Sequence, residues 1–436
     1  MILKFQFIVF YTLLLFLPVN LGRHFYFDFS SVNGIYIDYL IPTLYLTDLL
    51  IGLLLLFWLI DAISRPLRFR KVKPTILIVL ISFLTVVIAS ITIAENQPAA
   101  FYKGVKLLEF LLFTLWLTTH IELKRDFKNM AAVISLGVLG ESLLALAQWF
   151  RNGSIFGYAF FGEQPYSMLT PGIAKTAGLG ELHTRPYGTF PHPNVLGGYL
   201  SISLIWLLVS WFGGSDGTGL AKRPWMFNGW RLLTVGFGLL ALFLTFSRTA
   251  WVALGLGLTL LLIKKLTLAT IFRRILIGTF IIIGLSWAAF QFFPNINDQP
   301  AERNLETMDL SITRRRELNS FAFEMIRDHK VFGVGLNNFT VALDGYGRVS
   351  GLTRFLQPVH NIFLLVGAET GLFGLLAFLG LCLIALKKSI SASGLLILTL
   401  IQLFWLGLFD HYLLTLQPGL LLFCLSLGLA FSRQKN

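Results

Sequence analysis

The pair His360-Asn361 stands directly before a long apolar run and is the first candidate for chemistry in this sequence. Imidazole is the side chain best matched to proton transfer near neutral pH, so His360 could act as a general base. It could also be a hydrogen-bonded structural histidine or an anchor at a membrane interface. Asn361 could orient His360 or cap the helix that follows. The sequence leaves these roles open.

Arg248 is the second candidate, because it occupies an almost absent connection between two apolar segments. An arginine held so close to a bilayer costs about a few kcal/mol unless it is paired or hydrated. One interpretation is that the aliphatic part of the Arg248 side chain extends along the apolar region, so that the guanidinium reaches the membrane interface. The functional interpretation is a phosphate clamp, since a guanidinium can bind two phosphate oxygens at once.

Three consecutive arginines, Arg314 to Arg316, open a segment with apolar residues at helical spacing. At about 100° per residue, Arg315 falls close to Ala322 and Ile326 on the apolar side. Arg314 falls at the other edge of that side, and Arg316 points into solvent. We therefore expect Arg315, and after it Arg314, to contact an anionic substrate.

Lys103, Lys106 and Glu109 recur at spacings of three and so share one side of a predicted helix. They could form an interfacial ion pair beside a lysine that reaches the membrane surface. Alternatively, the two lysines could guide an anionic lipid headgroup toward the site. Glu141 and Glu369 lie within apolar segments, so we expect each to face the bundle interior or a wet cavity.

The elements that position these residues are predicted to cross a membrane. The chain has 436 residues, of which 56% are hydrophobic and only 13% are charged. This composition predicts an integral membrane protein with a single polytopic domain, residues 1–436. The net charge of +13 does not indicate nucleic-acid binding, because the basic residues cluster between apolar runs.

Apolar runs long enough to cross the hydrocarbon core predict an all-α protein with about twelve transmembrane helices. The predicted spans are residues 2–21, 41–63, 75–94, 101–119, 130–150, 194–212, 231–247, 249–263, 272–292, 360–386, 391–409 and 411–431.

Basic residues follow every even-numbered span, which places these connections and both termini in the cytoplasm by the positive-inside rule. They are Arg65, Arg68, Arg70, Lys71, Lys73, Lys124, Arg125, Lys128, Lys222, Arg223, Lys264, Lys265, Arg273, Arg274, Lys387, Lys388, Arg433 and Lys435. The sequence thus predicts a multi-pass protein of the plasma (inner) membrane.

Two long segments then face outward, residues 151–193 and residues 293–359. In the second, Leu318, Ala322 and Met325 belong to an apolar face that predicts an amphipathic helix along the outer membrane surface. The helix is expected to end at glycines that follow it, Gly333 and Gly335.

This topology gathers on the outer face several residues that are far apart in sequence, namely Arg185, His192, Arg248, the run Arg314 to Arg316 and His360. Arginines near helix ends on that face are candidates for binding an anion. His183 and His192 are interpreted as turn residues, and Asp410-His411 as the cap of an outer turn. No cysteine–histidine pair has zinc spacing, and the outer loops lack paired acidic residues for a divalent ion. We therefore expect neither a metal nor a cofactor.

A resemblance rests on His360, Asn361, Gly371 and Gly374, a His-Asn pair followed nine residues later by Gly-x-x-Gly. This pattern resembles the signature of the bacterial O-antigen ligase superfamily, whose members include polymerase-like proteins and O-linked oligosaccharyltransferases. Three further stretches are similar to family segments in their order: residues 185–198, Ser247-Arg248 and residues 315–335. The O-antigen ligase-like region covers residues 194–380.

The resemblance implies a GT-C-like, metal-independent glycosyltransferase. It would move a glycan from an undecaprenyl-pyrophosphate carrier to an acceptor hydroxyl, on a lipid or a glycan, at the outer face of the membrane. His360 would be the general base, and Arg248 and Arg315 would hold the pyrophosphate, with Arg185, Arg314, Asn361, Lys103 and Lys106 as further substrate-binding candidates.

Two alternatives share the same sequence features. A polysaccharide polymerase of the superfamily would use the same donor but a growing carrier-linked chain as acceptor. A transporter of lipid-linked sugar should carry polar groups near the bilayer midplane on broken, repeated helices, whereas these candidates gather at one face.

Overall fold

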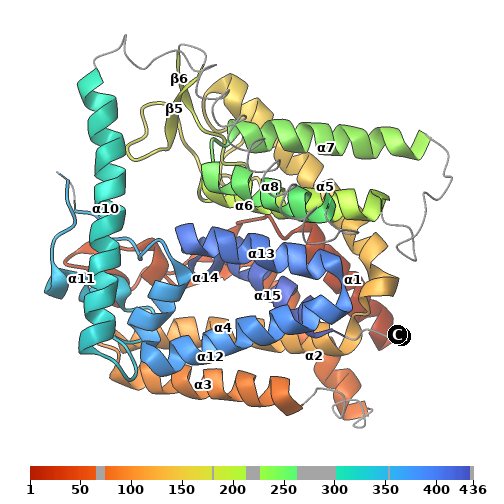
Figure 1. The fold of residues 1–436 in the computed structure, drawn as a ribbon, viewed down its shortest axis with the longest axis horizontal. Helices are drawn as coiled ribbons and strands as arrows, with labels where there is room; N and C mark the ends of the chain where they lie inside the picture. Colours follow the sequence, from red (N-terminus) through yellow and green to blue (C-terminus); the bar gives the residue numbers. More distant parts are fainter. Residues whose placement is uncertain (65–73, 179–180, 213–225, 263–300, 352–353, 433–436) are drawn as a thin grey trace, which may run out of the picture.

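The computed structural model describes residues 1–64, 74–178, 181–212, 226–262, 301–351 and 354–432. Helices dominate this part of the chain (Figure 1). The apolar ones are α1 (Ile2–Leu15), α2 (Leu46–Ser64), α3 (Pro74–Ile93), α4 (Gln97–His120), α5 (Leu123–Arg151), α6 (Pro193–Phe212), α7 (Met226–Leu244), α8 (Arg248–Leu262), α12 (Ile362–Ala392), α13 (Gly394–Phe409) and α15 (Gln417–Phe431).

Each predicted span overlaps one of these helices except the ninth, 272–292, which lies outside the described residues. Four helices are long and apolar enough to cross a membrane, namely α2, α5, α6 and α12. Six shorter apolar helices accompany them within the described ranges. The chain is therefore an all-α membrane protein, while the count of twelve crossings and the orientation stay predictions.

Two predicted spans differ from their helices because of proline. The first span was expected to reach residue 21, but α1 ends at Leu15, and Pro18 follows its C-cap. The last span divides into α14 (Tyr412–Thr415) and α15, which carries a proline in its first turn, Pro418. This division opens a short turn of backbone beside Asp410 and His411.

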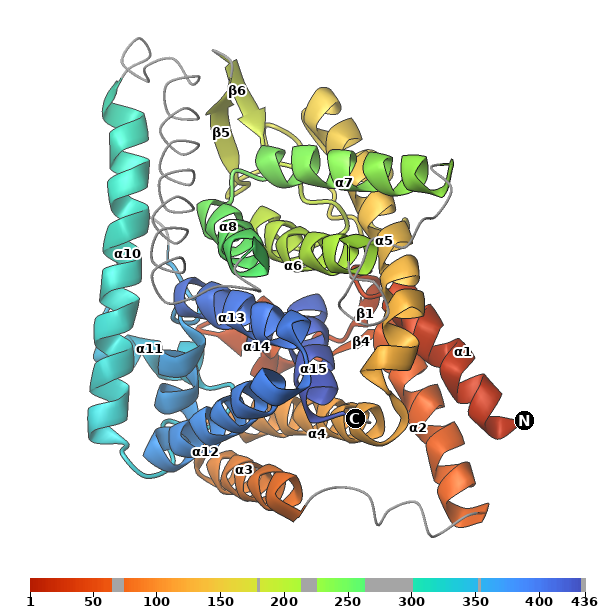
Figure 2. The ribbon, with the colours of Figure 1, turned by 45° about the vertical axis from the view of Figure 1, so that its right-hand side comes forward.

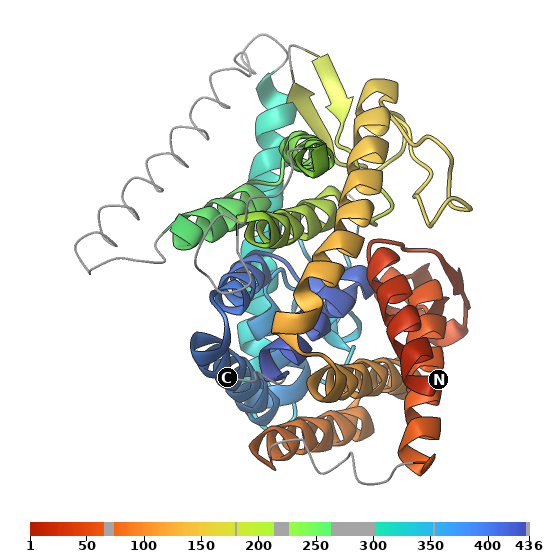
Figure 3. The same cartoon turned by 90° about the vertical axis from the view of Figure 1, so that its right-hand side faces the viewer.

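Helices α3, α4, α12 and α13 form one part of the bundle, with α3 packed on both α4 and α12 (Figure 1). Helices α5, α6, α7 and α8 form a second part, which α13 joins through contacts with α6 and α8. At the N-terminal side, α1 and α2 pack side by side (Figure 3).

Helix α10 (Ala301–Asp328) runs crosswise to α12 and α13, near their ends (Figures 1 and 2). Its residues Leu318, Ala322 and Met325 are fully buried in a cluster with α11 (Phe339–Tyr346) and the start of α12. The expected apolar face thus packs against the protein itself. The sequence predicted that this face lies against lipid, whereas in the structure it lies in a second, smaller core of the protein.

Helix α12 is broken at Gly371, whose φ of 69° and ψ of −171° are not helical. The loop after α10 fills the break, because the backbone nitrogen of Leu372 donates a hydrogen bond to the Lys330 carbonyl oxygen at 2.8 Å. A Cβ on Gly371 would lie 2.3 Å from the carbonyl oxygen of Val331. Glycine is required here both by the left-handed backbone and by this close approach.

Short antiparallel strand pairs, absent from the sequence prediction, shape the two segments beside the helix ends. In the first segment β1 (Gly22–His24) pairs with β4 (Thr43–Tyr45), and β2 (Ser31–Val32) pairs with β3 (Ile35–Tyr36). In residues 151–193, β5 (Lys175–Gly178) pairs with β6 (Glu181–Thr184). These ribbons position Arg185 and the wall of a cavity described below.

Candidate active site

His360 is carried on an extended segment that is fixed by its neighbour. Asn361 is the N-cap of α12, and its Oδ1 accepts hydrogen bonds from the backbone nitrogens of Phe363 (2.9 Å) and Leu364 (3.0 Å). Its Nδ2 donates to the Leu408 carbonyl oxygen at 3.2 Å. Asn361 therefore caps α12 and ties it to the end of α13, which sets where the His360 ring lies.

A cluster of histidines and one aspartate surrounds His360. Its ring centroid lies 5.0 Å from that of His411 in an edge-to-face arrangement. Ligand-type atoms of His360, Asp410 and His411 all lie within 4.8 Å of one another. Nδ1 of His360 is buried and has no hydrogen-bond partner among the described residues. That nitrogen therefore has an unused capacity for a hydrogen bond.

Asp410 and His411 are held by several hydrogen bonds. Oδ1 of Asp410 accepts from the His411 backbone nitrogen at 2.8 Å, and Oδ2 accepts from Nδ2 of Asn194 at 3.1 Å. Nδ1 of His411 is 2.7 Å from Oγ1 of Thr415. Asp410 does end α13, as a capping residue would. The carboxylate of Asp410 also lies close to the imidazoles of His360 and His411. Asp410 and His411 therefore belong to the cluster as well as to the turn after α13.

Burial sets the protonation states of this cluster. Burial lowers the pKa of His360 below its ordinary value, and the charge of Arg315 lowers it further, although Asp410 opposes both. Burial likewise lowers the pKa of His411 and of His192 to about 3. These imidazoles are neutral near pH 7 and can accept a proton. The pKa of Asp410 is lowered despite its burial, because His411, His360, His192 and the Asn194 amide favour the carboxylate.

Arg185 is linked to this cluster through Asn194, and Arg248 lies close enough to Arg185 to affect its pKa. Nη2 of Arg185 donates to Oδ1 of Asn194 at 2.8 Å, and its Nε donates to the Thr245 carbonyl oxygen at 2.6 Å. Burial lowers the pKa of Arg185 to about 10, and the positive charge of Arg248 contributes in the same direction. Arg248 is exposed at the first position of α8. A helix N-terminus with a free guanidinium suits an anion.

The three arginines of α10 have separate surroundings. Nη1 of Arg315 donates to the Phe409 carbonyl oxygen at 3.2 Å, next to Asp410, so Arg315 reaches the cluster. Arg314 instead donates to the Ser350 carbonyl oxygen at 2.7 Å and lies over the ring of Phe355 at 4.4 Å. Arg316 is exposed. Arg315 is therefore placed with the other candidates, and Arg314 anchors the loop after α11.

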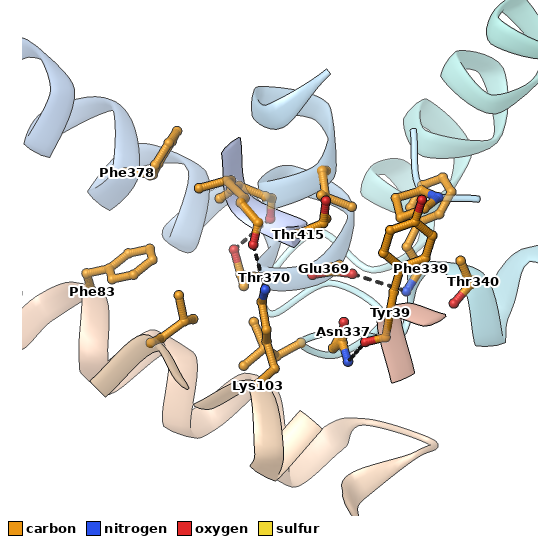
Figure 4. A pocket seen from close by; sticks show the side chains of 16 residues that line it. Tyr39, Phe83, Lys103, Asn337, Phe339, Thr340, Glu369, Thr370, Phe378 and Thr415 are labelled. Atoms are coloured by element: carbon orange, nitrogen blue, oxygen red, sulfur yellow. Dashed lines mark hydrogen bonds between the residues drawn. The ribbon is translucent and has the colours of Figure 1, made fainter. Parts of the chain in front are cut away.

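The two lysines of α4 lie inside the protein. Lys106 is buried and forms an ion pair with Asp48 of α2. Nζ of Lys103 donates to the Leu414 carbonyl oxygen at 2.5 Å. Figure 4 shows Lys103 pointing into a small cavity of about 50 Å³ that is also lined by Glu369, Tyr39 and Thr415. Oε1 of Glu369 accepts a hydrogen bond from the Phe339 backbone nitrogen at 3.4 Å, so this acid faces an internal cavity as expected.

The donor atoms of His360, Asp410 and His411 are close enough to bind a metal ion. Two imidazoles and a carboxylate are chemically suited to zinc. The sequence did not suggest this set, because its members are fifty residues apart and lack zinc spacing. The neutral imidazole of His360 can instead accept a proton from a hydroxyl group, and removal of metal distinguishes these two uses.

His192, Asn194, Asp410 and His411 were not among the residues predicted for the site. His192 does lie in the turn before α6, where its Nδ1 accepts from the Asn194 backbone nitrogen at 3.1 Å. The sequence did contain one sign that Asp410 and His411 belong to a site. They form an Asp-His pair between two apolar runs, where ionisable groups need a partner. Only the packing of α13 and α14 beside the start of α12 identifies that partner as His360.

The apolar helices define a membrane protein. The histidine–aspartate cluster at their ends, together with the nearby arginines, forms a polar site that suits an anionic substrate. Residues 233–379, about a third of the chain, match the family model described as O-antigen ligase. This part of the chain is thus similar to the O-antigen ligase family, and the match supports membership in that superfamily. The match contains Arg248, Arg315, His360 and Gly371. No curated protein matches the chain.

Proposed function

We propose that the protein is a metal-independent glycosyltransferase that moves a glycan from an undecaprenyl-pyrophosphate carrier to an acceptor hydroxyl. The observation that carries this proposal is the buried, unpartnered Nδ1 of His360. Next to its cluster, Arg185 donates to Asn194 and Arg315 donates to the Phe409 carbonyl oxygen, and residues 233–379 match the O-antigen ligase model. The site would face outward, with both termini in the cytoplasm.

In the proposed reaction, the acceptor oxygen attacks the anomeric carbon of the donor sugar while His360 takes the hydroxyl proton. The new glycosidic C–O bond forms as the bond from the anomeric carbon to the pyrophosphate oxygen breaks. The carrier pyrophosphate leaves with the bonding electrons. Charge develops on that leaving group, and stabilisation lowers the barrier most where charge develops.

The arginines have the role of receiving this charge. Arg248 and Arg315 would bind the pyrophosphate oxygens, with Arg185 holding Asn194 and, through it, Asp410. The charge of Asp410 favours the imidazolium that forms on His360. Lys103 and Lys106 would contribute to the electrostatic environment from the α4 side.

The test is glycan transfer by purified protein in lipid nanodiscs, with an undecaprenyl-pyrophosphate-linked glycan as donor and a cell-envelope extract as acceptor. His360→Ala should reduce transfer by about 10²-fold or more, the usual contribution of a positioned base. His329→Ala is the matched control, because His329 is an exposed histidine of the same outer segment. Full activity of His360→Ala would refute the proposal.

The same assay distinguishes a ligase from a polymerase of the superfamily. A glycan that appears on a lipid or protein acceptor indicates a ligase. A longer glycan that remains on the carrier indicates a polymerase.

A further inference from the structure

The cluster of His360, Asp410 and His411 has the composition of a site for a transition-metal ion. Two imidazole nitrogens and one carboxylate oxygen are ligands that zinc accepts in sites with three protein ligands. The donor atoms of these side chains lie within 4.8 Å of one another. The described part of the chain contains no other group of three histidine, cysteine or acidic side chains with this spacing. These residues are therefore its strongest candidate for a metal site.

The spacing of the two imidazole rings fits a shared ion. Zinc–nitrogen bonds of about 2.0–2.1 Å at a tetrahedral angle place the centres of two bound rings about 5 Å apart. The ring centroids of His360 and His411 are 5.0 Å apart, with an angle of 67° between the ring planes. Rotation of the side chains can then bring the donor atoms to one ion without a change in the backbone.

Hydrogen bonds behind the histidines leave the necessary lone pairs free. Oγ1 of Thr415 donates to the His411 carbonyl oxygen at 3.1 Å, so it can accept from Nδ1 of His411 at 2.7 Å. A proton held on Nδ1 leaves the lone pair on Nε2 of His411. Metal-binding imidazoles are commonly oriented by such an outer hydrogen bond. Nδ1 of His360 has no hydrogen-bond partner among the described residues.

The carboxylate of Asp410 is also held in position. Oδ1 accepts from the His411 backbone nitrogen at 2.8 Å, and Oδ2 accepts from Nδ2 of Asn194 at 3.1 Å. Asn194 is held in turn by Nη2 of Arg185 at 2.8 Å. Each carboxylate oxygen has two lone pairs, so both oxygens keep one for an ion. The negatively charged ligand is thus oriented before an ion arrives.

A positive charge beside the cluster opposes the binding of a cation. Arg315 donates to the Phe409 carbonyl oxygen at 3.2 Å, and its charge acts on both His360 and His411. The side chain of Arg315 is half-buried, so solvent screens part of this repulsion. The arginine also provides a test, because its removal should strengthen the binding of a metal ion at this position and at no distant one.

We propose that His360, Asp410 and His411 bind one zinc ion, and that this ion inhibits glycan transfer. A neutral imidazole has a single free lone pair. An ion bound to His360 takes the lone pair that would accept the proton of the acceptor hydroxyl, so His360 can no longer act as a base. Binding of the ion is independent of the proposed transfer function, whereas inhibition rests on it. Mg²⁺ and Ca²⁺ prefer oxygen ligands and should not bind here.

The first experiment measures metal binding without donor or acceptor. Full-length protein without an affinity tag, in phosphatidylcholine nanodiscs, is titrated with Co²⁺, whose visible absorption reports its ligands, and Zn²⁺ is then added to displace it. One ion should bind per chain. His411→Gln and Asp410→Asn should each weaken binding about tenfold or more. His329→Ala is the matched control, because His329 is an exposed histidine outside the cluster, and it should bind as the wild type does.

Arg315→Ala distinguishes loss of a ligand from loss of structure. A misfolded variant binds metal less tightly, whereas Arg315→Ala should bind zinc about threefold or more tightly than the wild type, because a repelling charge is gone. Arg316→Ala, on the exposed side of the same helix, should leave binding unchanged. Weaker binding by Arg315→Ala, or equal binding by His411→Gln, Asp410→Asn and the wild type, would overturn the inference.

The second experiment adds Zn²⁺ to the transfer assay. Zinc should inhibit at concentrations near its measured dissociation constant, EDTA should reverse the inhibition, and Mg²⁺ at the same concentration should have no effect. The half-inhibitory concentration should fall in Arg315→Ala and stay constant when the donor concentration is varied, which excludes capture of zinc by the donor pyrophosphate. Bound zinc without inhibition, or activity lost in EDTA and restored by zinc, would overturn the inference. Full activity of His360→Ala would refute the transfer mechanism separately and leave the binding experiment valid.

Discussion

Replacement of Arg315 by alanine tests the central electrostatic argument in two independent ways. Arg315 donates to the Phe409 carbonyl oxygen beside Asp410, and its charge lowers the pKa of His360. Its removal would therefore take away a cation proposed to bind the pyrophosphate and would also change the protonation of the proposed base. Arg316→Ala, on the exposed side of the same helix, is the control for loss of charge alone.

The rate effect follows from the position of Arg315. Loss of one donor that stabilises transition-state charge typically lowers kcat by about 10²- to 10³-fold. Arg315 is only half-buried, so water screens part of its charge and the lower end applies. We expect a loss of about 10²-fold, or about 2.7 kcal/mol at about 1.36 kcal/mol per factor of ten. Arg315→Lys should lose less, because it keeps the charge without the planar fork.

The pH effect has a definite sign. A general base works when it is deprotonated, so the rate falls as the pH falls through its pKa. Because Arg315 holds the pKa of His360 down, its removal raises that pKa, and the acid limb of the pH–rate profile moves to higher pH. An unmoved acid limb, or an equal rate loss in Arg316→Ala, would refute the placement of Arg315 beside His360.

Four further changes have expected outcomes. Asp410→Asn removes the charge that raises the pKa of His360. The acid limb of the pH–rate profile should therefore move to lower pH, opposite to its shift in Arg315→Ala, and the rate should fall by about tenfold or more. A shift of the acid limb to higher pH would contradict this. Arg314→Ala should lower thermal stability through loss of its contact with Phe355 and leave the donor KM unchanged; a raised donor KM would return Arg314 to the site. Gly371→Ala should cost roughly 1–3 kcal/mol from its backbone conformation alone, because its φ of 69° and ψ of −171° lie in a region that essentially only glycine adopts. Unfolding in detergent measures this cost. Gly380→Ala, which meets no neighbouring atom, should be neutral or stabilising. EDTA should leave transfer unchanged, and a loss restored by zinc would show that His360, Asp410 and His411 hold a metal.

The sequence was sufficient for the helices and for part of the site. Apolar runs such as those around Trp116 and Leu400 are stable only when they are buried in a membrane or a protein core. The composition and length of these runs therefore predict the helices directly. The helical phase of residues 314–326 distinguished Arg315 from Arg316, because a side chain's direction on a helix follows from its position alone. The roles of Lys103 and Lys106 as substrate contacts stay a prediction.

Tertiary structure decided which distant residues meet. Nothing in the local sequence around Asp410 or His192 indicates that they meet His360. Several helices separate these residues in the chain, and no short sequence pattern encodes how those helices pack. The same holds for a cavity of about 380 Å³ whose walls come from the β1–β4 ribbon, α4, residues 158–165 and the turn at α14. The sequence alone thus determined a membrane protein with His360 and outward arginines as candidates, because hydrophobicity and charge act locally. His360 comes close to Asp410, His411 and Arg315 only when the helices pack.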